Sequence, residues 1–323
     1  MALELVKTLQ SAKREQWISL LAASGLTPEE MPEVTVLVWD DDQLIATGSR
    51  QGNLLKYIAV AGDRQGEDLT ATVLTALRQN AFEAGYSHLF LYTKPKNEYL
   101  FTSLFFYPIA KTADVLLMEN RQNGIADFLK SLPVKGEDAG AVVMNCNPFT
   151  KGHRYLIEAA AAQCKHLYVF VLSEDRSEFS AADRLEMVQL GTRDLGNVTV
   201  LPTGPYLISS VTFPTYFLKN KETLPQVQCL LDIEIFTRYY APRLGITRRF
   251  VGSEPFCAVT AEYNRILAES LPQKGIALHQ LPRLEQDGTP ISASAVRKLW
   301  KEAQWNKLKA LVPETTYEFL RRR

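Results

Sequence analysis

Short apolar runs alternate with longer amphipathic runs throughout the second half of the chain. The short runs have the length of buried strands, and the longer runs carry apolar residues at helical spacing. The predicted strands are 140–144, 166–172, 198–202, 248–252 and 276–281. The predicted helices are 152–164, 181–191, 230–244, 260–271 and 292–302. This alternation predicts a doubly wound parallel sheet with helices on both faces, whose ligands bind at the carboxyl ends of the strands.

The first half of the chain shows a different order of elements. The predicted strands are 34–39, 43–48, 54–60 and 86–92, and a helix is predicted over 69–84. A polar stretch at 131–139, with Pro133 and Gly136, separates the two halves. Such stretches are typical of domain boundaries. We therefore expect an α+β domain over residues 1–133 and a parallel-sheet domain over residues 134–323.

The order of elements in the first domain resembles the acyl-CoA N-acyltransferase (GNAT) family. In that family a glycine-rich turn opens a helix and offers backbone N–H groups to the pyrophosphate of CoA. Here the turn contains Gly66, but Asp63 and Asp68 stand at two positions of the family motif. Because their carboxylates would repel a pyrophosphate, we expect a GNAT-like scaffold or docking surface rather than an active CoA site.

Composition narrows the classes of function. The 323 residues are 46% apolar and 22% charged, with 36 basic and 36 acidic side chains. This balance argues against a general nucleic-acid or membrane-surface binder, either of which needs a basic excess. The four cysteines form no CxxC pair, and no stretch reaches the length of a membrane span. We expect a cytoplasmic protein without a metal site of its own.

The first chemical motif follows the first strand of the second domain and reads Asn-Cys-Asn-Pro-Phe-Thr-Lys-Gly-His over residues 145–153. Thr150 and His153 are three residues apart, so they share one face of the first helical turn. Gly152 leaves room for a phosphate beside the backbone, and the helix N-terminus supplies free N–H groups. Phosphoryl transfer needs mainly positioning and charge neutralisation. We therefore expect a phosphate cradle that includes Asn147 and Lys151, although Lys151 is equally expected to point to water.

A second motif, Ile-Ser-Ala-Ser-Ala-Val-Arg over residues 291–297, begins a late helix. Ser292 is expected to be the N-cap, and Ser294 and Arg297 share one side of the helix. Two hydroxyls, free N–H groups and a guanidinium suit a triphosphate. The alternative is a plain serine cap followed by an exposed arginine.

Further residues are expected near this site or in the core. Gly252, Ser253 and Glu254 end one strand and are predicted to line the nucleotide, with a simple loop as the alternative. Arg184 on the helix after the second strand is a candidate phosphate ligand. A solvent-exposed helix arginine is the equally weighted alternative for Arg184. Three further residues are expected to have no catalytic role. Asp232 and Glu234 are expected to be solvated, and Cys146 is expected to fill the core rather than act as a nucleophile.

The two motifs together resemble the nucleotidyltransferase superfamily, which carries a (His/Thr)-x-Gly-His signature and a Rossmann-like fold. The whole chain resembles the citrate lyase ligase family, on its residues 140–156, 250–256 and 311–320. The resemblance implies roles for His153, Thr150 and Arg297 at the reacting phosphorus. It also implies that ATP and acetate form acetyl-AMP with release of pyrophosphate. The acetyl group would then pass to the prosthetic-group thiol on the acyl-carrier subunit of citrate lyase.

Mg²⁺ is expected to arrive with ATP, held mostly by phosphates and water. Two alternatives remain open from the sequence. The chain is an adenylyltransferase that acts on a phosphorylated coenzyme precursor, or it is a non-catalytic sensor that binds CoA or a nucleotide. The intact set of Thr150, His153 and Arg297 argues for catalysis, whereas the damaged glycine motif of the first domain favours a sensor.

Overall fold

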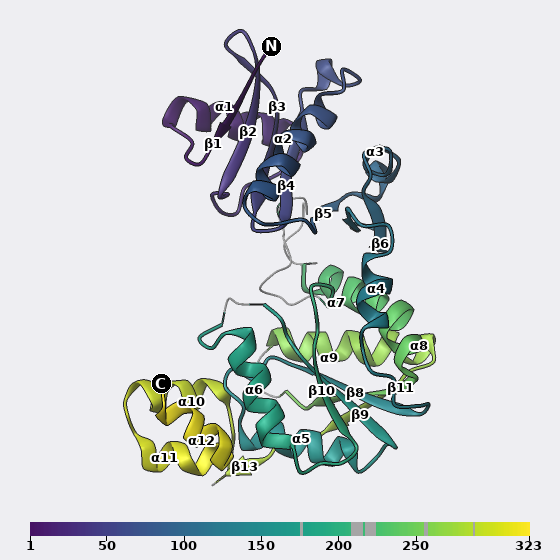
Figure 1. Ribbon diagram of the computed structural model, residues 1–323, viewed down its shortest axis with the longest axis vertical. Helices are drawn as coiled ribbons and strands as arrows, with labels where there is room; N and C mark the ends of the chain where they lie inside the picture. The colour runs from purple at the N-terminus through teal and green to yellow at the C-terminus, as the bar shows by residue number, and fades with distance from the viewer. Residues whose placement is uncertain (175–176, 208–215, 217–223, 255–257, 287) are drawn as a thin grey trace. The chain divides into compact units, whose positions relative to one another are not determined.

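The computed structural model describes residues 1–174, 177–207, 216, 224–254, 258–286 and 288–323. Contacts divide the chain into two compact units, shown in Figure 1. The first comprises Met1–Gly124 and Pro214–Val227, and the second comprises Ile125–Phe213 and Gln228–Arg323. Each unit is described by itself.

The first unit contains a seven-stranded sheet in the order β1-β2-β3-β4-β5-β7-β6. Its strands are β1 Ala2–Val6, β2 Val34–Asp40, β3 Gln43–Gln51, β4 Leu54–Val60, β5 Phe90–Thr93, β6 Tyr107–Lys111 and β7 Leu116–Glu119, and its helices are α1 Ser11–Ala23, α2 Leu69–Glu83 and α3 Glu98–Ser103. The strands β4 and β5 pair in parallel, and the other neighbours pair antiparallel. This mixed sheet with its helices is an α+β arrangement, as the element order predicts.

The core of this unit lies between α2 and the sheet. Leu69, Val73, Leu74 and Leu77 of α2 are buried against the sheet, whereas Phe82, which has a similar helical spacing, is 70% exposed. A Cβ atom on Gly48 of β3 would lie 2.5 Å from Val73 Cγ1, so a residue without a side chain is needed for this close approach.

The second unit is built on a five-stranded parallel sheet in the order β10-β9-β8-β11-β12. The strands are β8 Ala139–Met144, β9 His166–Val171, β10 Val198–Pro202, β11 Ile246–Gly252 and β12 Ala277–Leu281, and the short strands β13 Glu285–Gln286 and β14 Thr289–Pro290 form a separate hairpin. The helices are α4 Gly124–Lys130, α5 Lys151–Ala161, α6 Ala181–Thr192, α7 Leu224–Ile235, α8 Ala241–Leu244, α9 Ala258–Ser270, α10 Ala293–Lys301, α11 Trp305–Leu311 and α12 Glu314–Arg321. The strand order reverses at β8, and this confirms the doubly wound, Rossmann-like prediction.

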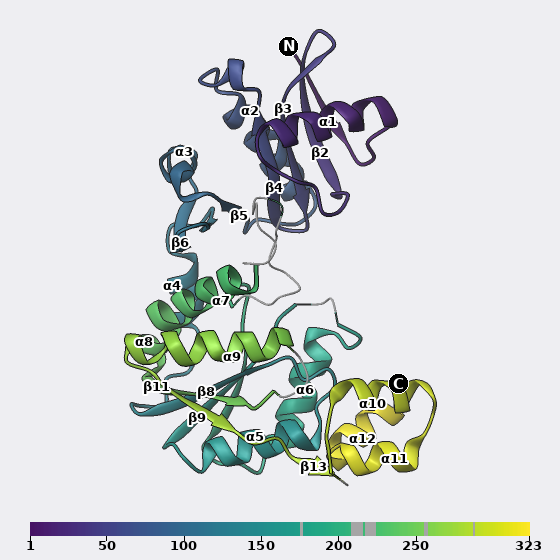
Figure 2. The ribbon, with the colours of Figure 1, turned by 180° about the vertical axis from the view of Figure 1, so that it is seen from behind.

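Helices cover both faces of the parallel sheet. Figures 1 and 2 show α5 on one face and α9 on the other. The C-terminal helices α10, α11 and α12, which end the chain in yellow, pack beside α6 through buried Val296, Leu308, Val312 and Leu320. Because helices in such a sheet run antiparallel to the strands, their N-termini gather at the carboxyl edge.

The fold departs from the sequence predictions at the domain boundary, in one helix and at one carboxylate. The second unit begins at Ile125 rather than at residue 134, because α4 packs there: the ring of Phe128 lies 5.5 Å from that of Tyr206. The helix predicted over 230–244 is divided into α7, a π-helical turn at Phe236–Tyr240 and α8, with Pro242 in the first turn of α8.

The third departure concerns Asp232, which is buried rather than solvated. It is 2% exposed, and its carboxylate accepts a 2.6 Å hydrogen bond from Tyr263 Oη and lies 3.5 Å from Arg249 Nη2. Arg249 lies on β11, and Phe236 packs on its guanidinium. The buried pair therefore belongs to the core between the sheet and the helices α7 and α9. Glu234 forms an ion pair with Lys274 instead.

Candidate active site

The carboxyl edge of the parallel sheet is shaped by the turn that follows β8. After Met144 the chain passes through Cys146, whose φ is +53°, and a cis Asn147–Pro148 peptide bond before α5 begins at Lys151. Phe149 is fully buried within this turn. The turn thereby places Thr150 and the first residues of α5 at the end of the central strand.

Thr150 and His153 form a reciprocal N-terminal cap on α5. Thr150 Oγ1 accepts a hydrogen bond from the backbone N–H of His153, and the backbone N–H of Thr150 donates to His153 Nδ1 over 3.1 Å. Because Nδ1 accepts that bond, the proton of a neutral imidazole is on Nε2. The ring also stacks on Phe149 at 6.0 Å between centroids. The cap fixes both the tautomer and the orientation of the imidazole.

The imidazole of His153 is neutral at physiological pH. Burial, and secondarily the positive charge of Arg283, lower the pKa of His153 from 6.5 to about 4. A neutral ring with Nε2–H donates one hydrogen bond and carries no net charge. Any anion bound beside it must therefore be neutralised by other groups, in the first place by guanidinium groups.

The second motif lies against this turn although it is far away in the sequence. Ser292 is the N-cap of α10 and accepts a hydrogen bond from Ala295 N–H, as predicted. Arg297 Nη2 donates to Ser294 Oγ over 3.0 Å, and Arg297 Nη1 donates to the backbone oxygen of Asn147. The structure thus brings the N-terminal ends of α5 and α10 together at the carboxyl edge.

Gly152 is packed against protein. A Cβ atom placed on it would lie 3.4 Å from the backbone oxygen of Ile291 and 3.5 Å from Thr150 Oγ1. Its missing side chain lets the segment before α10 approach α5, which differs from the predicted opening toward a phosphate.

The end of β11 contributes the third part of the edge. The N–H of Ser253 donates to Leu281 O over 2.8 Å, and Asn264 Nδ2 donates to Gly252 O over 2.9 Å. Arg283, which follows β12, donates from Nε to Ser253 O over 2.7 Å and from Nη2 to the Glu254 carboxylate. Residues 255–257 lie outside the described part of the chain.

Sequence reasoning missed Arg283. The available signal was a basic residue directly after a parallel strand, in the sequence Leu-Pro-Arg at residues 281–283. In a parallel sheet every strand ends at the same edge, so such a residue belongs to the candidate site by position alone.

Two predicted ATP ligands are directed elsewhere. Arg184 is fully buried and donates to the backbone oxygens of Phe179, Glu174 and Asn145, and to Asn145 Oδ1. It therefore holds the turn from beneath and does not present its guanidinium to a ligand. The ammonium group of Lys151 lies 3.4 Å from Lys309 O, toward the C-terminal helices.

Asn147 and Cys146 also serve the turn itself. Asn147 Oδ1 accepts a hydrogen bond from Phe179 N–H over 3.1 Å, and this side chain is therefore already engaged. Cys146 is 1% exposed, and burial raises the pKa of its thiol. A protonated, buried thiol is the expected core filler and a poor nucleophile.

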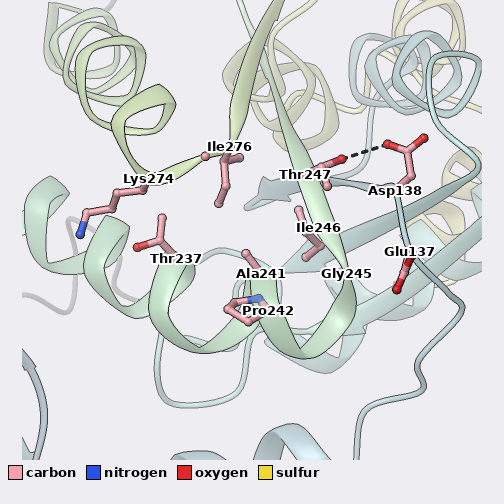
Figure 3. A pocket seen from close by; sticks show the side chains of 11 residues that line it. Glu137, Asp138, Thr237, Ala241, Pro242, Gly245, Ile246, Thr247, Lys274 and Ile276 are labelled. Carbon is pink, nitrogen blue, oxygen red and sulfur yellow. Dashed lines mark hydrogen bonds between the residues drawn. The ribbon is translucent and has the colours of Figure 1, made fainter.

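A cavity of about 490 Å³ occupies the opposite edge of the sheet (Figure 3). Glu137 and Asp138 before β8, Thr247 on β11 and Lys274 before β12 are among its lining residues. Thr247 Oγ1 donates to Asp138 over 3.1 Å. This cavity lies at the amino ends of the strands, away from both sequence motifs.

In the part of the chain that the structure describes, no three His, Cys, Asp or Glu residues are grouped to hold a metal ion. Across the same residues, no helix combines the length and the apolar character that crossing a membrane requires.

Comparison with known proteins identifies the family. Residues 139–320 match the model described as the citrate lyase ligase C-terminal domain. The chain is 40% identical over 327 residues to "[Citrate [pro-3S]-lyase] ligase" of Klebsiella pneumoniae, covering 98% of this chain and 96% of that protein. The chain belongs to the citrate lyase ligase family. The Escherichia coli K12 member is 39% identical over 324 residues, which are 98% of this chain and 92% of that protein.

A solved structure, Thermotoga maritima TmcAL bound with alpha-thio ATP, aligns with 58% of this citrate lyase ligase family member and 56% of that chain. The TM-score is 0.34 and the identity 16%. At this score the likeness is partial, and the family assignment rests on the sequence relatives.

Proposed function

We propose that the protein is an ATP-dependent acid–thiol ligase that activates acetate as acetyl-AMP and acetylates the prosthetic-group thiol on the acyl-carrier subunit of citrate lyase. The observation that carries this proposal is the meeting of the Thr150/His153 cap with the N-terminus of α10 at the carboxyl edge. Membership in the citrate lyase ligase family supports the ligase activity and the partner.

The chemistry has two steps at this edge. A carboxylate oxygen of acetate attacks the α-phosphorus of ATP, the bond from that phosphorus to the oxygen bridging to the β-phosphate breaks, and pyrophosphate leaves. The thiolate sulfur then attacks the acetyl carbonyl, the acyl C–O bond breaks, and AMP leaves. The thiol proton passes to solvent.

The described residues fit the first step. His153 Nε2–H donates to an oxygen of the α-phosphate, where charge develops during attack. Arg297, with Ser292, Ser294 and the free N–H groups of α10, holds the leaving pyrophosphate. Mg²⁺ would be held by the phosphates and water, since the described residues offer no ligand cluster for it.

The first unit offers a place for the prosthetic arm. Strands β4 and β5 pair at only two positions, where Leu54 lies opposite Phe90 and Leu55 opposite Leu91. Beyond these pairs, residues of both strands line a cavity of about 580 Å³. Backbone groups of separated strands offer hydrogen bonds to an amide-containing chain. Asp68 lines this cavity together with the basic residues Arg64, Lys94 and Lys96, so its wall carries charges of both signs and can accept an arm that contains phosphate groups.

Acetate-dependent exchange of labelled pyrophosphate into ATP tests the first step. We expect the exchange rate of His153→Ala to fall about 100- to 1000-fold, because one preorganised donor to the developing charge is lost. His166→Ala is the matched control, since His166 lies at the amino end of β9 and bonds to Thr199. Unchanged exchange in His153→Ala would refute the role of the imidazole. Adenylylation without acetate would favour the coenzyme-precursor alternative, and binding without turnover would favour a sensor.

Blocking the cavity of the first unit separates the second step from the first. Ala71→Trp places a large side chain on the cavity-lining side of α2, whereas Thr75→Trp places it one turn on, at an exposed position outside the cavity. We expect Ala71→Trp to slow acetylation of the carrier and to leave pyrophosphate exchange intact. Equal carrier acetylation by both variants would remove the cavity from the proposal.

A further inference from the structure

Arg283 is a charged residue at the carboxyl edge to which neither sequence motif assigns a role. It lies two residues after Leu281, the last residue of β12, and its side chain is 30% exposed. The backbone next to it is tied to the second motif, since Ile291 N–H donates to Leu284 O over 3.1 Å. Ile291 in turn packs against Gly152, the residue before His153. Arg283 is thereby connected to both halves of the candidate active site.

Two of the three guanidinium nitrogens of Arg283 are fixed by protein acceptors. Nε donates to Ser253 O over 2.7 Å, and Nη2 donates to the Glu254 carboxylate, whose side chain is 7% exposed. Nη1 has no hydrogen-bond partner among the described residues. A guanidinium held in this way presents its remaining donor in one orientation, which lowers the entropy lost when a ligand binds.

The electrostatics agree with this placement. The positive charge of Arg283 contributes to the lowered pKa of His153, so the guanidinium acts on the imidazole through space. A neutral imidazole cannot balance a polyphosphate, and the charge must come from groups placed around it. Glu254 pairs with Arg283 through Nη2, so among the described residues the Nη1 donor remains available to an anionic ligand.

We propose that Arg283 is a second guanidinium of the nucleotide site, which donates from Nη1 to the phosphate chain of ATP while Ser253 and Glu254 hold it in place. The inference rests on the proposed use of ATP and adds a residue that binds the β- and γ-phosphates. No step is altered: Arg283 exchanges no proton and forms no covalent bond. Its effect is on binding and positioning of the triphosphate.

The alternative is that Arg283 only ties the end of β11 to β12. The two roles predict different ligand dependence, because AMP lacks the β- and γ-phosphates. Loss of a residue that binds the β- and γ-phosphates weakens the binding of ATP and leaves the binding of AMP unchanged. A misplaced loop weakens the binding of both nucleotides equally. The ratio of the two dissociation constants therefore separates the roles.

Calorimetric titration of the full-length protein with ATP and with AMP, without acetate, provides the test. For Arg283→Gln we expect the Kd of ATP to rise about 10- to 100-fold, because one charge-assisted hydrogen bond is lost. The Kd of AMP should rise less than about 3-fold. Arg283→Lys should recover part of the ATP affinity. Arg265→Gln is the matched control, because Arg265 is an exposed arginine on α9 that is likewise paired with carboxylates, Glu262 and Glu269.

An equal rise for ATP and AMP, or no rise for either, would overturn the inference. Should Arg283→Gln fail to fold, the ATP-to-AMP ratio of Arg283→Lys decides the question. Wild-type protein that binds ATP but shows no acetate-dependent exchange would defeat the proposed function and leave this inference standing. Wild-type protein that binds no ATP would defeat both.

Discussion

The two edges of the parallel sheet contrast in their charge and in the helix ends that they gather. At the carboxyl edge the N-termini of α5 and α10 meet beside Arg297 and Arg283. At the amino edge Glu137 and Asp138 line the cavity of Figure 3, Gly245 is the C-cap of α8, and Lys274 pairs with Glu234 as Arg283 pairs with Glu254. Helix C-termini and carboxylates repel anions. The contrast therefore rests on the helix N-termini and on Arg297 at the carboxyl edge, and on the carboxylates and the helix C-terminus at the amino edge.

The largest effect should come from breaking the support beneath the carboxyl edge. Arg184→Ala removes the guanidinium that donates to the backbone oxygens of Asn145, Glu174 and Phe179. We expect the free energy of unfolding to fall by about 3 to 5 kcal/mol, because buried acceptors lose charge-assisted bonds and a cavity forms. Urea unfolding measures this loss, with Arg193→Ala, exposed at the end of the same helix, as the control. A loss no greater than that of Arg193→Ala would show that Arg184 does not hold the turn.

A smaller effect should appear as a pH dependence specific to the carboxyl edge. The folded-state pKa of His153, about 4, lies below its ordinary value of 6.5. As pH falls below 6.5 the unfolded chain takes up the proton first, so stability is lost between pH 6.5 and 4 and is fully present above that range. The full loss amounts to about 3 kcal/mol.

Urea unfolding at several pH values, compared with His153→Gln, isolates this contribution. Glutamine at the third helical position retains a reciprocal cap with Thr150 and does not titrate. The wild type should lose stability relative to the variant as the pH is lowered from 6.5 to 4. Parallel curves for the two proteins would mean that the imidazole has an ordinary pKa in the folded state.

The smallest of the three effects concerns nucleotide affinity and tests the contrast in charge directly. Arg297→Gln should raise the Kd of ATP about 100-fold, since a guanidinium without a carboxylate partner among the described residues is removed from the phosphate site. Lys274→Gln removes a cation from the amino edge and should change the Kd less than about 2-fold. Titration calorimetry of both variants gives the comparison. Equal losses would erase the distinction between the two edges.

The sequence predicted the fold best where burial imposes a clear period. All five strands of the parallel sheet and the helix α2 are confirmed within a few residues, because their apolar positions match the strand and helix periods. The strand β1 was missed, since much of it is exposed and it is fixed by pairing with β2 rather than by burial. The helices α11 and α12 were missed because each is short and has few buried residues of its own.

At the candidate active site the sequence predicted positions better than contacts. The cap at Ser292, the shared face of Thr150 and His153 and the pairing of Ser294 with Arg297 follow from spacing along a helix, and all are present, whereas the role of Thr150 as N-cap was not predicted. The orientation of the Arg184 side chain could not be predicted, because several of its hydrogen-bond acceptors belong to segments that are distant from it in the sequence. The same holds for the buried partner of Asp232 and for Arg283, whose contacts arise only when β11 and β12 lie side by side.

The most direct test of the central chemical claim, attack of acetate on the α-phosphorus of ATP, is a single turnover with ATP, deacetylated citrate lyase and ¹⁸O-labelled acetate. If a carboxylate oxygen forms the bond to phosphorus and the acyl C–O bond then breaks, one label appears in the phosphate of AMP, and pyrophosphate is unlabelled. Label in inorganic phosphate, with ADP as the other product, would contradict the account.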